Sequence, residues 1–157
     1  MKGRILTLIL VLAVCAPLFA VDPPETPEAK QIVDLVNNAA TLLQQKGKDA
    51  FTAFRAKESV WYKGDHYVFV YDLDGTVLCN PGFPAYEGKN LMEMKDPNGK
   101  AFVHELIETA KAKGSGWVDY VLPKPGESIP SKKISYVKTA KMPDGQTVMV
   151  GSGIWVK

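Results

Sequence analysis

Residues 67–80 read YVFVYDLDGTVLCN, and this stretch decides how the second half of the chain folds. Two runs rich in β-branched and aromatic residues stand on either side of the pair Asp74-Gly75. Asp-Gly between two such runs is among the strongest short-range signals of a β-hairpin, because glycine adopts the positive φ that tight turns require. The stretch therefore predicts two antiparallel strands, with Asp72 capping the turn through backbone amides.

The same letters allow a second interpretation. A strand that ends in one Asp, with another two residues later, resembles the first motif of the haloacid-dehalogenase phosphatases, which implies Asp72 as nucleophile and Asp74 as general acid. Such an enzyme also needs a later pair of carboxylates that hold Mg²⁺ together with the first Asp. The last predicted strand contains no acidic residue. We therefore expect no catalytic residue and keep the phosphatase as a remote alternative.

Three more strands are predicted after this hairpin, at 117–122, 133–141 and 146–155. Asp144-Gly145 forms the turn between the last two. Short hairpins favour antiparallel pairing, because parallel strands need a long crossover connection. The predicted fold class is α+β, with a long N-terminal helix packed on a five-stranded antiparallel sheet and a flap of loop and helix between 80 and 113.

The predicted N-terminal helix rests on one apolar stripe. Apolar residues recur at helical spacing up to residue 45: Ile32, Leu35, Val36, Ala39, Leu42 and Leu43. Pro27 suits a first helical turn, and Gly47 is placed to end the helix. Shorter helices are predicted at about 49–55 and 101–112, each with one apolar face.

The first twenty residues have the form of a signal peptide. Lys2 and Arg4 precede a run that is apolar apart from Thr7, and small residues end it near Ala20. Residues 5–21 come close to the ~17-residue lower limit for spanning a bilayer, so an uncleaved membrane anchor is an alternative. Either way we expect the remainder to lie in a bacterial periplasm.

The rest of the chain is organised as a Pro-rich spacer, 21–28, and one domain, 29–157. Residues 1–20 contain two of the nineteen basic residues and none of the seventeen acidic ones, so the remainder carries seventeen of each. No basic excess is left for nucleic-acid binding, and we expect no nucleic-acid partner. Cys79 is the only cysteine after residue 20, so an internal disulfide is excluded there.

Several short motifs follow one another in a fixed order. They are Asp74-Gly75-Thr76, Asn80-Pro81, Gly88 to Leu91, Asp96 to Gly99, Gly116 to Tyr120, Ser135 to Lys138 and Gly151 to Ile154. In this order and at these spacings, residues 29–155 resemble the single Cache domain found outside the membrane in bacterial chemoreceptors and sensor kinases. Asn80-Pro81 departs from the His-Pro common in that family, which puts the carry-over of ligand specificity in doubt.

The resemblance implies a helix on one face of a PAS-like sheet and a small-molecule pocket between the other face and the loops. It further implies sensing of a small organic ligand, often a short carboxylate, without enzymatic activity or cofactor. Relatives continue into signalling domains, so we expect a stand-alone module that acts through a separate membrane chemoreceptor or sensor kinase. A homodimer through the long helix is a further expectation, and a ligand-free interaction module is the alternative.

One side of the first predicted strand is aromatic. Tyr67, Phe69 and Tyr71 point to the same side, because side chains alternate along a strand. Aromatic walls with a few placed polar groups are typical of small-ligand pockets. The predicted ligand-binding residues are Phe69, Tyr71, Tyr120, Lys133, Tyr136 and Lys138. A lysine would pair with a carboxylate, and the sequence leaves open which of the two points inward.

Metal binding is not expected. His66 and His104 are the only histidines, and neither has a cysteine or another histidine at metal-ligand spacing.

Overall fold

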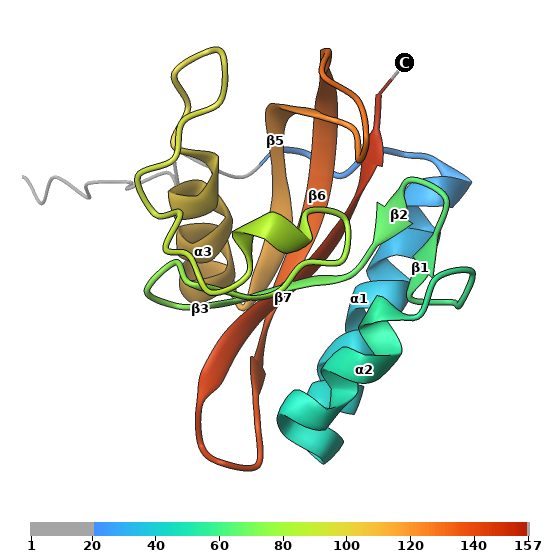
Figure 1. The fold of residues 1–157 in the computed structure, drawn as a ribbon, viewed down its shortest axis with the longest axis vertical. Coiled ribbons are helices and arrows are strands. Elements are labelled where there is room, and N and C mark those ends of the chain that lie inside the picture. Colours follow the sequence, from blue (N-terminus) through green and yellow to red (C-terminus); the bar gives the residue numbers. More distant parts are fainter. Residues whose placement is uncertain (1–20, 157) are drawn as a thin grey trace, which may run out of the picture.

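The five-stranded sheet lies between two helical layers (Figure 1). The computed structural model describes residues 21–156. Its helices are α1 (Pro27–Lys46), η1 (Gly47–Asp49), α2 (Ala50–Arg55), η2 (Pro84–Tyr86) and α3 (Phe102–Lys113). Its strands are β1 (Tyr62–Lys63), β2 (His66–Tyr67), β3 (Phe69–Asp72), β4 (Val77–Cys79), β5 (Ser115–Pro123), β6 (Pro130–Lys141) and β7 (Thr147–Trp155).

The sheet confirms the predicted fold class. Its strand order is β4-β3-β7-β6-β5, and every neighbouring pair is antiparallel. One element was not predicted: β1 and β2 form a separate two-stranded ribbon, in which Tyr67 pairs with Tyr62. The first sheet strand therefore begins at Phe69 rather than at Tyr67.

The Asp74-Gly75 turn joins β3 to β4, as the sequence predicts. Oδ1 of Asp72 accepts hydrogen bonds from the backbone amides of Asp74 at 3.0 Å and Thr76 at 2.7 Å. Gly75 has a φ of 94°, which a residue with a side chain rarely adopts. Asp72 thus has a structural role in this turn.

Helix α1 begins and ends where its flanking residues satisfy free backbone groups. The hydroxyl of Thr26 accepts from the amide of Ala29 at 3.1 Å, and Pro27 occupies the first turn. At the other end Gly47, with a φ of 55°, donates its amide to the carbonyl of Leu43. The buried stripe of α1 packs on β6 and β7.

The sheet has an apolar layer on each face. On the helix face, which α1 and α2 cover, lie small branched residues of the strands such as Val70 and Val150. On the opposite, aromatic face lie Tyr67, Phe69 and Tyr71 together with the buried side of α3. Figure 1 shows α1 and α3 on opposite sides of the sheet. The strands therefore contribute to two separate cores by alternation, except in β4, where a register shift places Val77 and Cys79 on different faces.

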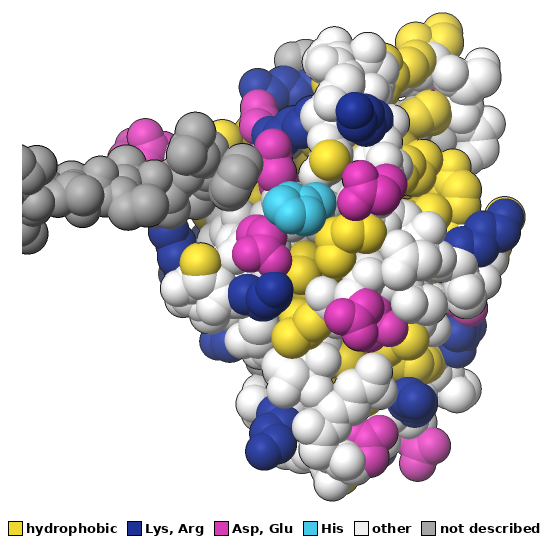
Figure 2. Space-filling view, turned by 90° about the vertical axis from the view of Figure 1, so that its left-hand side faces the viewer, with side chains coloured by type: hydrophobic (Ala, Val, Ile, Leu, Met, Phe, Trp, Pro, Cys, Tyr) yellow, Lys and Arg dark blue, Asp and Glu magenta, His cyan; other side chains and the backbone are white. Residues whose placement is uncertain are grey.

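The outer surface on the α3 side carries charges of both signs. Figure 2 shows acidic and basic side chains interspersed there with apolar ones, without a large patch of a single sign. Within residues 21–156, no helix combines the length and the apolar character needed to cross a membrane. The predicted leader, residues 1–20, lies outside the described part of the chain.

Candidate functional site

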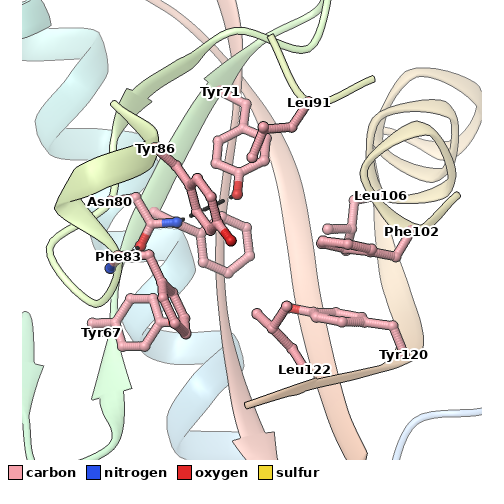
Figure 3. Close-up of a pocket in the computed structure, with 11 residues that line it drawn as sticks. Tyr67, Tyr71, Asn80, Phe83, Tyr86, Leu91, Phe102, Leu106, Tyr120 and Leu122 are labelled. Atoms are coloured by element: carbon pink, nitrogen blue, oxygen red, sulfur yellow. Dashed lines mark hydrogen bonds between the residues drawn. The ribbon is translucent and has the colours of Figure 1, made fainter. Parts of the chain in front are cut away.

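A pocket lies between the aromatic face of the sheet and the segments packed on it (Figure 3). Its lining residues are Tyr67, Phe69, Tyr71, Asn80, Phe83, Tyr86, Leu91, Phe102, Leu106, Tyr120 and Leu122. The free volume of the cavity is about 10 Å³. A cavity of that size holds roughly one water molecule. The site is therefore closed around its own side chains in this conformation.

Tyr67, Phe69 and Tyr71 form a continuous aromatic row. The ring of Phe69 lies 6.4 Å from that of Tyr67 and 5.6 Å from that of Tyr71, between centroids. Gly151 on β7 makes room for this row, because a Cβ atom there would lie 2.6 Å from the ring of Phe69. Burial raises the pKa of the Tyr71 hydroxyl to about 12, so that group stays neutral at physiological pH.

The opposite wall comes from α3 and β5. The rings of Phe102 and Tyr120 stack with their centroids 4.8 Å apart and their planes at 14°. The Tyr120 hydroxyl shares a hydrogen bond of 2.9 Å with Oγ of Ser135, and burial raises the pKa of this phenol. This wall is apolar apart from that one satisfied hydroxyl.

The third side is the pocket loop, residues 80–91, which includes η2 (Figure 3). Asn80 begins it and is itself buried: its Nδ2 donates to the hydroxyl of Tyr71 at 3.3 Å, and its Oδ1 accepts from the backbone amide of Phe83 at 3.1 Å. Gly82 lies directly against the ring of Tyr67, at a distance that leaves no space for a Cβ atom. Phe83 and Tyr86 then extend over the aromatic row.

Glu87 connects the pocket loop to α2. Its Oε2 pairs with Nη2 of Arg55 at 2.7 Å, and its Oε1 accepts from the amide of Asn80 at 2.8 Å. Burial acts to raise the pKa of Glu87, but the hydrogen bonds from Arg55 and from the Asn80 amide outweigh it and lower the pKa. The loop is thus attached to the helical layer through a charged group.

Lys133 on β6 is the unusual charged residue of the site. Only 1% of its surface is exposed, and its Nζ donates to the hydroxyl oxygen of Tyr67 at 3.0 Å. Three aromatic rings, which we name the lysine cage, surround the Nζ atom. Their centroids lie 4.3 Å (Tyr67), 4.7 Å (Trp155) and 5.7 Å (Phe69) from Nζ.

Among the residues that the structure describes, none gives the lysine cage a counter-ion. Within residues 21–156, no carboxylate forms an ion pair with Lys133. Burial lowers the pKa of Lys133 to about 7 and outweighs the opposite effect of the Asp65 charge. A buried amine without an anionic partner is costly, because burying a charge needs compensation.

The structure brings four of the six predicted site residues together. Phe69, Tyr71 and Tyr120 line the pocket, and Lys133 stands behind the Tyr67 hydroxyl.

Tyr136 and Lys138 lie on the opposite face, which corrects their predicted grouping with Lys133. The ring of Tyr136 packs against Trp117 at 5.4 Å, and Nζ of Lys138 donates to Oδ1 of Asn37 on α1 at 2.9 Å. Residues on one strand share a face only when an even number of positions separates them. Lys133 is three and five positions away from the other two, so the alternation excludes a common face.

Sequence reasoning missed the residues that close the pocket. Phe83 and Tyr86 belong to a loop without periodicity, and Trp155 lies in a β7 segment in which nearly every residue is buried. No pattern of residue types marks Phe83 and Tyr86 as pocket residues, or Trp155 as a neighbour of Lys133. The family departure at Asn80 was the one available signal in the loop.

The phosphatase interpretation finds no support in this geometry. Oδ1 of Asp72 is engaged by two turn amides, and within the described residues no group of three His, Cys, Asp or Glu side chains could hold a metal ion.

The sequence profile of the Cache domain matches residues 29–157. The chain belongs to the Cache domain family. Cache domains are non-catalytic sensor modules of larger signalling proteins, and this confirms the family predicted from the motif order.

Two solved structures support the assignment. One, described as the periplasmic sensor domain of a chemotaxis protein, is 35% identical, with a TM-score of 0.64 over 80% of this chain and 88% of that one. The other, described as the structural basis for carboxylic acid recognition by a Cache chemosensory domain, is 29% identical, with a TM-score of 0.69 over 83% of this chain and 94% of that one.

Relatives known by name are longer signalling proteins. Methyl-accepting chemotaxis protein McpP of Pseudomonas putida is 33% identical over 104 residues, 66% of this Cache domain chain and 19% of that protein. Sensor histidine kinase MctS of Rhizobium johnstonii is 32% identical over 140 residues, 84% of this chain and 29% of that protein. The chain thus spans less than a third of either relative.

Proposed function

We propose that this Cache domain is an extracytoplasmic sensor module that binds a short carboxylate between the aromatic face of the sheet and the pocket loop. The observation that carries the proposal is Lys133, a buried amine beside the pocket without a carboxylate partner in the described chain. A carboxylate would supply the missing counter-ion through charge-assisted hydrogen bonds. The similarity to a Cache domain known for carboxylic acid recognition supports the same ligand class.

The pocket supplies complementary surfaces for such a ligand. Lys133 bonds to the hydroxyl of Tyr67, whose side chain lines the cavity, so a carboxylate that bonds to both groups would point its hydrocarbon part toward Phe69 and Leu106. Apolar walls with few polar groups favour a small acid with a short apolar tail. The proposed polar anchors are therefore Lys133 and Tyr67, and Phe69, Tyr71 and Tyr120 are the proposed apolar contacts.

Binding requires the pocket to enlarge. The free volume of about 10 Å³ accommodates one water molecule, whereas acetate has four heavy atoms. Phe83 and Tyr86 are the side chains to move, because the loop that carries them is outside the sheet and lies over the cavity. The closed conformation is then the ligand-free state of a pocket that opens through its loop.

Calorimetric titration with acetate and propionate at pH 6.5 tests the proposal. We expect saturable binding, which is lost or weakened by at least about tenfold in Lys133→Met because the anion then lacks its cation. Lys138→Met is the matched control: it removes a lysine from the same strand but from the helix face, and should bind normally. Equal binding by both variants, or no binding by the unchanged protein, would refute the proposed site.

A second candidate function is an interaction module that binds no small molecule. The cavity volume of about 10 Å³ favours it, because a filled interior is also what a purely structural core shows. This candidate predicts that no short carboxylate shifts the melting temperature, and that a membrane receptor is captured equally well by the unchanged protein and by Lys133→Met.

The proposed location and partners follow from the same relatives. One solved relative is described as a periplasmic sensor domain, so we propose an extracytoplasmic location, reached through residues 1–20 as a signal peptide or a tether. The proposed partner is a chemoreceptor or a sensor kinase, the two kinds of protein in which similar domains occur. A homodimer through α1 is proposed as well, and sedimentation velocity with a variant altered on the exposed side of α1 tests it.

A further inference from the structure

We propose that the site takes up its carboxylate together with a proton, which ends on Nζ of Lys133, so that ligand affinity falls as the pH rises above neutrality. This inference rests on the proposed function and concerns its regulation. It makes the domain responsive to pH as well as to the ligand.

The surroundings of Lys133 provide the geometric basis. The side chain is enclosed by rings from three elements, Tyr67 on β2, Phe69 on β3 and Trp155 on β7, and within residues 21–156 its one hydrogen bond goes to a neutral phenol. Rings attract an ammonium only through their quadrupoles, a weaker compensation than an ion pair in a buried site. The enclosed amine therefore gains little from carrying a charge until an anion arrives.

The other titratable groups around Lys133 do not supply the negative charge of the missing anion. Tyr67 and Tyr120 are phenols whose pKa burial raises, so both stay neutral near pH 7. Asp65 is the carboxylate that acts to raise the pKa of Lys133, but its Oδ2 pairs with Nζ of Lys124 at 3.1 Å, and its side chain is about half exposed. Water screens a group that exposed.

The charges balance when solvent provides the proton. Before binding, a neutral amine occupies the cage; after binding, an ammonium and a carboxylate face each other with no net charge buried. The free amine has a pKa lowered by burial to about 7, and a bound anion raises it again. Acetate remains ionised above pH 6.5. Above this pH, therefore, the proton taken up on binding goes to the protein and not to acetate.

The coupling has a definite sign. Above pH 7 the free protein must acquire a proton to bind, so the apparent Kd should rise with pH and approach about tenfold per unit between pH 8 and 9. Below pH 7 the amine is already charged, and the Kd should be nearly constant.

Titration of acetate at pH 8 in phosphate and in Tris measures the proton directly, because these buffers release different heats on ionisation. We expect a difference in heat that corresponds to uptake of nearly one proton, and the same result with Lys138→Met. Equal heats in both buffers and a Kd independent of pH would overturn the coupling. Absence of acetate and propionate binding at pH 6.5 would instead refute the proposed function itself.

A second measurement needs no ligand. NMR titration of ¹³C-labelled lysine side chains, with the Lys133 signal identified by its loss in Lys133→Met, follows the charge on this amine. We expect it to titrate near neutrality in the free protein and at higher pH with saturating acetate. A Lys133 signal that stays that of a charged amine up to pH 9 in the free protein would overturn the inference, whether or not acetate binds.

Discussion

Gly151 allows the aromatic row to lie flat on the sheet. An added methyl group there would stand 2.6 Å from the Phe69 ring and 2.8 Å from Cγ1 of Val137, in a core without spare volume. We predict that Gly151→Ala lowers the free energy of unfolding by about 1–3 kcal/mol, the usual cost of overpacking. Urea denaturation measures the change.

Gly116→Ala is the control for this prediction. Its Cβ would meet a single atom, Cγ2 of Thr109, whereas a Cβ at Gly151 would meet three. We expect a smaller loss than at Gly151. Equal losses at both positions would contradict the account of the aromatic row.

We predict that Lys133 also makes the stability of the ligand-free protein depend on pH. Its pKa is about 7 in the folded state, against about 10.4 in an unfolded chain. Between these values the unfolded state binds the extra proton, so the contribution of Lys133 to stability rises with pH from 7 to 10. Stability thus rises with pH over the range in which ligand affinity is predicted to fall.

Lys133→Met should remove this rise. We predict that the variant is more stable than the unchanged protein at pH 7, because an apolar side chain of similar volume replaces an uncompensated buried amine, and that the difference shrinks toward pH 9. Urea denaturation at both pH values decides it. A difference that does not vary with pH would show that Lys133 keeps an ordinary pKa in the fold.

At the scale of elements, the pocket loop is bonded to strands at both ends, through Asn80 to Tyr71 of β3 and through the backbone of Gly88 and Lys89 to Val77 of β4. Its attachment to α2 is the pair Arg55–Glu87, with 44% of the Arg55 side chain exposed. Pairs of this exposure contribute about 0.2–1 kcal/mol. Removing the pair should therefore loosen the loop without unfolding the domain.

Arg55→Gln tests this prediction by hydrogen exchange. We expect the amides of Asn80 and Phe83 to exchange a few times faster, because Glu87 loses its cation and holds the loop less well. Lys111→Gln breaks another exposed pair, Glu108–Lys111 at 2.7 Å, away from the loop, and should leave these amides unchanged. Unaltered exchange in Arg55→Gln would mean that the pair does not restrain the loop.

The sequence predicted well those elements that have a helical spacing of apolar residues or a recognisable turn. Helix α1 was predicted from its apolar stripe and its flanking Pro27 and Gly47, and β3–β4 from the Asp74-Gly75 turn. The pocket loop has neither signal. Its side chains are positioned by contacts with β3, α2 and α3, which are distant in sequence. For the same reason the closing side chains Phe83 and Tyr86 were missed.

Strand alternation alone separates the β6 residues that face the pocket from those that face α1. Lys133, Tyr136 and Lys138 were grouped by residue type, although their spacing places Lys133 on a different face from the other two. What no alternation could predict is the lysine cage, since Tyr67, Phe69 and Trp155 meet around Nζ only when three strands are assembled.

At the scale of the whole molecule, the sheet separates a structural core from a candidate binding face. The helix face is filled by α1, α2 and aliphatic strand residues, whereas the aromatic face contains the pocket and the buried Lys133. The pair Arg55–Glu87 links the two sides at the edge of the sheet. A change in the pocket loop can therefore reach the helical layer through a direct contact.

A crystal structure of the protein soaked in acetate tests the central claim most directly. We predict a carboxylate within about 3 Å of both Nζ of Lys133 and the hydroxyl of Tyr67, with Phe83 and Tyr86 displaced to admit it. An acetate bound elsewhere, with the pocket closed and the lysine cage unchanged at saturating ligand, would contradict it.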